Sequence, residues 1–159
     1  MLSKDEAKEM RTAFWKGFKH YCAQKRIRYR WVLTGLRIPS TQLKFYADKN
    51  KALVMFQIDH RNTLTRYYIY EIFQSYFQLF REYCGPDLRW EEDYEGVEEH
   101  KVSAVYFEIS GVGIYNIGDW EKIYAFFVQK MPLLEKVYFD FKDLIIERIK
   151  SERRWISKT

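Results

Sequence analysis

Two short segments of this chain carry residue types that could hydrolyse a phosphodiester bond. Pro86-Asp87 is followed further along the chain by Glu99-His100-Lys101. Two carboxylates at such positions can hold a divalent metal such as Mg²⁺, and a nearby lysine can help to activate a water molecule. The sequence therefore offers Asp87, Glu99 and Lys101 as catalytic candidates, with Asp87 and Glu99 as the metal ligands.

The same residues also have a simpler structural explanation. Gly85-Pro86 is a strong helix stop, because glycine adopts the left-handed conformation and proline cannot continue a helix. The acidic residues around Glu99 fit a solvated turn. The pattern matches the PD…(D/E)-x-K signature of the restriction-endonuclease-like nucleases, but an acid-rich stretch satisfies so short a signature by chance. A metal-dependent nuclease of that type is therefore the alternative hypothesis and not the favoured one.

A basic segment near the N-terminus is a second candidate, for nucleic-acid binding. Arg26, Arg28 and Arg30 alternate with apolar and aromatic residues. Such a mixture suits nucleic acid, since cations bind phosphates and rings stack on bases. In the alternative, which we favour, the rings belong to the core and the cations face water. Phe18 and Tyr21 already fall on the apolar stripe of the preceding helix pattern.

The other residues that commonly carry chemistry show no catalytic or metal-binding spacing. The three histidines, His20, His60 and His100, are scattered, and each is expected to be a surface or boundary residue. Cys22 and Cys84 are too far apart in sequence for a zinc site or a disulfide framework. No cofactor is expected, and a divalent metal such as Mg²⁺ enters only with the nuclease alternative.

Composition limits the class of protein. The chain has 159 residues, of which 47% are hydrophobic and 19% aromatic, which is enough for one packed domain and argues against disorder. Its net charge of +5 permits nucleic-acid contact without requiring it. No apolar run approaches the roughly 20 residues needed to cross a bilayer, and no signal-peptide pattern is present. We therefore expect a cytoplasmic protein without a membrane partner.

Hydrophobic periodicity and capping signals predict a helix, two strand-strand-helix units and a tail. Ser3 and Glu6 form a capping box, and Asn62 is a plausible N-cap for the second helix. The apolar stripe of the last helix continues through Pro132, which predicts a kink or a break at Met131-Pro132. The predicted elements are a helix over 3–24, a hairpin over 43–59, a helix over 62–84, a hairpin over 88–110, a kinked helix over 118–150 and a frayed tail over 151–159.

These elements predict one α+β domain over residues 1–159. We expect an antiparallel sheet of about four strands, in the chain order α-ββ-α-ββ-α(α), with helices packed on the sheet. The run from Ala52 to Ile58 is apolar on both faces apart from Gln57, so this strand should lie in the interior of the sheet. The long last helix could cover its own sheet or a second copy of the chain, and a homodimer is therefore one prediction.

The chain also resembles a bacterial family of unknown function whose members occur as short stand-alone proteins and as the C-terminal part of longer ones. The resemblance covers most of the chain, and it rests on Phe14-Trp15, Lys44-Phe45, Ala52-Leu53-Val54, Leu88-Arg89-Trp90-Glu91, Val105-Tyr106, Ile114-Tyr115-Asn116 and Trp120. Some of the longer relatives join this domain to nuclease-like regions. The resemblance implies an accessory role near nucleic acid, and it assigns no catalytic residue.

The favoured function is thus a non-catalytic binding or interaction module for nucleic acid or a protein partner.

Overall fold

The first helix begins where the sequence places a cap. In the computed structural model, which describes residues 1–27 and 31–158, the Ser3 side chain accepts a hydrogen bond from the Glu6 backbone N–H, and helix α1 runs over Lys4–Gln24. Phe14, Phe18 and Cys22 form its buried stripe. The stripe packs against the last helix, and the Tyr124 hydroxyl donates to the Phe14 carbonyl.

The sheet has four antiparallel strands, which confirms the predicted fold class. Strands β1 (Thr41–Ala47) and β2 (Lys51–Ile58) form the first hairpin, and β3 (Arg89–Tyr94) and β4 (Val102–Ser110) form the second. The spatial order is β1-β2-β4-β3, so the two hairpins join through β2 and β4. Strand β2 is an interior strand, and all its residues after Lys51 are buried, as its two-sided apolar sequence predicts.

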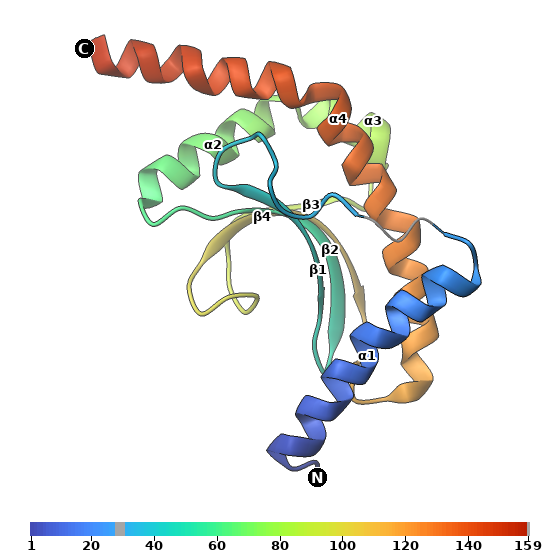
Figure 1. Ribbon diagram of the computed structural model, residues 1–159. Coiled ribbons are helices and arrows are strands. Elements are labelled where there is room, and N and C mark those ends of the chain that lie inside the picture. The colour runs from blue at the N-terminus through green and yellow to red at the C-terminus, as the bar shows by residue number, and fades with distance from the viewer. Residues whose placement is uncertain (28–30, 159) are drawn as a thin grey trace.

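The helices between and after the hairpins differ from the prediction in two places. The predicted helix over 62–84 is divided at Tyr76 into α2 (Thr63–Ser75) and α3 (Phe77–Cys84). The last helix, α4, follows a short 3₁₀ turn, η1 (Ile117–Asp119), and continues over Trp120–Lys158 where a frayed tail was expected. Pro132 lies inside α4 without ending it. Figure 1 shows that the sharp bend of the helix lies further along, in its orange-red part.

The two faces of the sheet are covered in different ways. The main core lies on the face that carries Val54, Phe56 and Phe107, and it includes residues from all four α-helices. The other face carries a smaller buried cluster around Leu53, Met55 and Tyr106, packed against Val97. Figure 1 shows the loop between β3 and β4 folding back on this second side. The sheet therefore has helices on one face and an acidic loop on the other.

Candidate functional site

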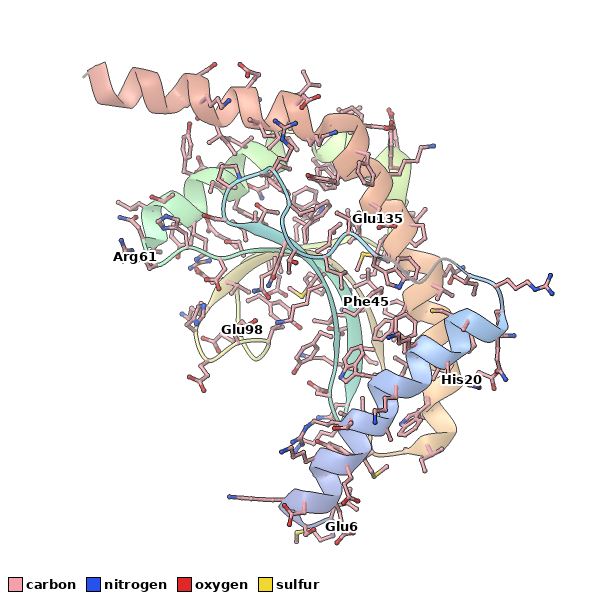
Figure 2. The ribbon with its side chains drawn as sticks, in the orientation of Figure 1. Glu6, His20, Phe45, Arg61, Glu98 and Glu135 are labelled. Atoms are coloured by element: carbon pink, nitrogen blue, oxygen red, sulfur yellow. The ribbon has the colours of Figure 1, made fainter. Side chains whose placement is uncertain are left out.

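A polar hollow opens where the chain leaves β2 and enters α2. Strand β2 pairs with β4 so that Ile58 lies opposite Ser103, which places the residues after Ile58 beside the residues before Val102. The hollow has a volume of about 950 Å³ and is lined by Asp59, His60, Arg61, Thr63, Arg66, Tyr67, Asp93, His100 and Lys101. Figure 2 labels Arg61 at the α2 side and Glu98 in the facing loop.

Arg66 forms the floor of the hollow. It is 4% exposed, and its guanidinium donates to the Ser103 hydroxyl at 2.8 Å, to an Asp93 carboxylate oxygen at 2.7 Å and to the Glu92 carbonyl. These contacts tie α2 to both strands of the second hairpin. Because its charge is already matched by Asp93, Arg66 is a structural cation of this site.

Asp93 is held in its charged form. The Arg66 hydrogen bond, followed by the one from Tyr67, lowers the pKa of this carboxyl below its ordinary value. The Tyr67 hydroxyl lies 2.8 Å from one carboxylate oxygen, and this contact raises the pKa of the tyrosine. Asp93 is therefore fully engaged by its neighbours and adds little free negative charge to the hollow.

Asp59 has a histidine as its partner. The His100 Nε2 atom lies 2.8 Å and 2.9 Å from the two Asp59 carboxylate oxygens. His60 is fixed separately, because its Nδ1 accepts a hydrogen bond from the Asn62 backbone N–H at 2.9 Å. Two imidazoles thus line the same hollow, each with a defined partner.

Arg61 and Lys101 are the cations with the weakest internal pairing. Lys101 Nζ lies 3.6 Å from Glu95, whose side chain is 74% exposed, and so exposed a pair contributes little. Among the described residues, none forms an ion pair or hydrogen bond with Arg61, which is exposed. Both side chains can therefore reach a ligand with most of their charge uncompensated.

The first turn of α2 adds backbone donors at the rim. Asn62 caps this helix by accepting a hydrogen bond from the Thr65 backbone N–H at 3.0 Å. The N–H groups of Thr63 and Leu64 precede the first intrahelical bond, and the helix dipole makes this end partly positive. The rim of the hollow therefore favours an anion.

The loop between β3 and β4, which forms the opposite wall, is anchored to the face of the sheet that carries the smaller buried cluster. Glu98 pairs with Lys44, and the Gln57 side-chain amide donates to Glu98 at 3.3 Å. The hydrogen bond from Lys44 lowers the pKa of the Glu98 carboxyl. The Tyr46 hydroxyl also lies 3.0 Å from the Gly96 carbonyl oxygen. These contacts hold the loop, and with it His100 and Lys101, at the end of β2.

Comparison with protein families places the chain in a known group of sequences. The model of the domain of unknown function DUF4268 matches residues 10–142, which is most of the chain. The chain belongs to this family. Comparisons with curated proteins and with solved structures found no match. In the part of the chain that the structure describes, no helix is long and apolar enough to cross a membrane.

The structure does not gather the three nuclease candidates of this DUF4268 domain. Asp87 lies next to β3 at the end where Arg89 pairs with Tyr106, and it lines a separate hollow with Glu108 and Lys130. Glu99 and Lys101 lie at the other end of the hairpin, where Tyr94 pairs with Val102. Strand rise puts the two ends about 15 Å apart, too far to share one metal ion.

Other groupings of potential ligands give no metal site either. Within the described ranges, no three or more His, Cys, Asp or Glu side chains are arranged to hold a metal ion. The Mg²⁺-dependent nuclease thus stays a prediction, without a gathered ligand set among these residues. The cysteines give no nucleophile in its place, since both are buried and burial raises the pKa of the Cys84 thiol to about 12.

The basic segment is described only in part. Arg26 follows the end of α1 and has a left-handed backbone conformation, with φ of 54°. Arg28 and Arg30 lie outside the described residues. Phe18 and Trp31 contribute to the main core, as the favoured alternative expects. Nucleic-acid binding by the three arginines, like the homodimer, stays a prediction.

Sequence reasoning missed most of the hollow, although a signal for it was present. His60 and Arg61 lie between a buried strand that ends at Ile58 and the N-cap Asn62 of a helix, an arrangement typical of anion sites. His100 and Lys101 directly precede a strand that could pair with the first. Only the strand order β2-β4 brings these two pairs together, and the sequence does not specify that order.

Proposed function

We propose that this domain binds the phosphate backbone of nucleic acid in the hollow at the start of α2. The observation that carries the proposal is the balance of charge there. The lining residues include three cations, Arg61, Arg66 and Lys101, and two carboxylates, Asp59 and Asp93. Asp93 is paired with Arg66 and Asp59 is in contact with His100, so Arg61 and Lys101 are the cations that lack a strong ion pair among the described residues.

The character of the walls supports a polyanion over a small metabolite. Pockets for small molecules are lined mainly by apolar and aromatic side chains that bury most of the ligand. The lining residues here are charged or polar. Tyr67 is the one tyrosine among them, and its hydroxyl donates a hydrogen bond to Asp93. Such walls attract an extended anion through charge. Binding of this kind releases counterions and weakens steeply as salt is added.

The test is a salt-dependent titration of a fluorescent oligonucleotide by anisotropy. The variant Arg61→Ala/Lys101→Ala should bind at least about tenfold more weakly than the wild type, because each lost phosphate contact removes a charge-assisted bond. The slope of log K against log salt should become shallower by roughly 0.7 to 0.9 for each contact removed. A matched control, Lys8→Ala/Lys122→Ala, removes two exposed lysines from α1 and from the start of α4.

The control variant should bind like the wild type, with an unchanged salt slope. If both double variants bind as tightly as the wild type, the hollow is not the site. Equal loss in both would mean that net charge alone governs binding. A free nucleoside triphosphate that binds more tightly than the oligonucleotide would contradict the choice of a polymeric ligand.

A further inference from the structure

His100 and Asp59 form a pair that can orient an imidazole as a base. The carboxylate only accepts hydrogen bonds, so a neutral His100 must carry its proton on Nε2, the atom that lies between the two Asp59 oxygens. The Nδ1 atom then keeps its lone pair. No described residue hydrogen-bonds to Nδ1, and the side chain is 60% exposed. Because His100 lines the hollow, its exposed ring is open to a group bound there.

Two further groups in the same hollow can serve a reaction at phosphorus. Lys101 follows His100 directly, and both side chains line the hollow. His60 accepts from the Asn62 N–H through Nδ1, so its neutral form presents an Nε2–H donor. An oriented base, an ammonium donor and an imidazole donor are thus placed around the space that we assign to a phosphate.

We propose that this hollow cleaves RNA by metal-independent transesterification. His100 Nδ1 takes the proton of a ribose 2′-hydroxyl, and the 2′-oxygen attacks the adjacent phosphorus. The bond from phosphorus to the 5′-oxygen breaks, and that oxygen leaves with a proton from Lys101 Nζ. The products are a 2′,3′-cyclic phosphate and a 5′-hydroxyl end. His100 then releases its extra proton to solvent, and Lys101 takes one up from solvent.

This inference rests on the proposed phosphate binding and names both a substrate and a reaction for the same hollow. His100 is the catalytic base in it, and Asp59 is a positioning residue that fixes the ring and its tautomer. The charged groups facing His100 are Asp59, in contact, and Glu98, close enough for His100 to lower its pKa. Lys101, the next residue in the chain, is a further charged neighbour of His100. DNA, which has no 2′-hydroxyl, should bind without being cut.

The test incubates an end-labelled single-stranded RNA with the full chain in the presence of EDTA. The wild type should give fragments that end in a 2′,3′-cyclic phosphate. His100→Gln should reduce the cleavage rate by at least about 100-fold, the usual loss when a general base is removed. Its affinity for the all-deoxy oligonucleotide should stay within about twofold of wild type, since the phosphate contacts of Arg61 and Lys101 remain. The Lys8→Ala/Lys122→Ala variant should cleave at the wild-type rate, and the loss of cleavage in His100→Gln excludes a contaminating nuclease.

Asp59→Asn separates positioning from folding. It should lower kcat with little change in KM, and it should move the acid limb of the pH profile, because an amide can hold the ring in the other tautomer. Urea denaturation of both variants shows that they fold. Three results would each overturn the inference while leaving phosphate binding in place. The wild type could bind RNA and leave it intact, cleavage could stop when EDTA is added, or the His100→Gln variant could cleave as fast as the wild type. Absence of RNA binding would overturn both.

Discussion

At the scale of single residues, two arginines in the same hollow have opposite roles. Arg66 is buried and donates three hydrogen bonds, whereas Arg61 is exposed and meets no described carboxylate. A buried guanidinium is costly to leave unpaired, so its partners are part of the fold. An exposed one costs little and can bind a ligand. The sequence alone does not separate them, because both are arginines near the start of one helix.

Replacing Arg66 should therefore damage stability. Arg66→Met keeps much of the side-chain volume but leaves Asp93, Ser103 and the Glu92 carbonyl without their shared donor. We expect a loss of about 3 kcal/mol in the free energy of unfolding, measured by urea denaturation. The matched change Arg61→Met should cost less than about 0.5 kcal/mol. Equal stability of the two variants would show that the Arg66 network does not hold α2 to the hairpin.

Asp93 gives the fold a dependence on acid. Its pKa in the folded state is lowered by Arg66 and then by Tyr67, so its contribution is present above the unfolded value of about 3.9 and is lost as pH falls through the folded value. Asp93→Asn should be less stable than wild type near pH 7, and the gap should close below about pH 4. Urea midpoints across this range check it. A gap that stays constant with pH would rule out a charge-based contribution.

At the scale of elements, register is what builds the site. The start of α2 and the end of the β3–β4 loop are about 40 residues apart in sequence, yet the antiparallel pairing of β2 with β4 places them side by side. Neither segment forms the hollow alone. Local sequence signals identified the caps at Ser3 and Asn62 and the first hairpin, since those depend on neighbouring residues.

The elements that the sequence placed less well depend on tertiary contacts. The division at Tyr76 has no proline or glycine to announce it. The extension of α4 past residue 150 follows a segment in which Arg148 donates to Ser75 at 2.9 Å, a contact made across two helices. The pairing of the two hairpins is likewise a long-range choice. A single sequence does not reveal which strand edges meet, and so the hollow was not predicted.

One glycine shows how closely two elements approach. A Cβ atom on Gly113 would lie 2.2 Å from the Lys49 carbonyl oxygen in the β1–β2 turn. The same contact region includes the Ile114 N–H bonded to the Asp48 carbonyl at 3.0 Å. Because the obstacle is backbone, Gly113→Ala should cost about 2 kcal/mol or more in the free energy of unfolding.

Gly118→Ala is the comparison for that change. Its Cβ would meet a side-chain oxygen of Asn116 at 3.3 Å, which a small movement can relieve. We expect a loss below about 1 kcal/mol by the same urea denaturation. Similar losses in the two variants would contradict a specific role for the close approach at Lys49.

At the scale of the whole molecule, the two faces of the sheet are covered by different parts of the chain. The helices build the main core on one face, and the acidic loop closes a smaller cluster on the other. The predicted α+β class follows from the chain order of its elements and is what the fold shows. The hollow lies at the end of β2, between the start of α2 and the loop that connects β3 to β4. Its position lets a ligand contact α2 and the loop at the same time.

The most direct test of the account locates the ligand on the molecule. Backbone amide signals of ¹⁵N-labelled protein can be followed by NMR while a short single-stranded oligonucleotide is added at low salt. If phosphate binds in the hollow, the shifted signals should cluster at residues 59–67 and 93–101, and Arg61→Ala/Lys101→Ala should abolish most of the shifts. Shifts that instead cluster along residues 16–37, or no shifts at all, would contradict it.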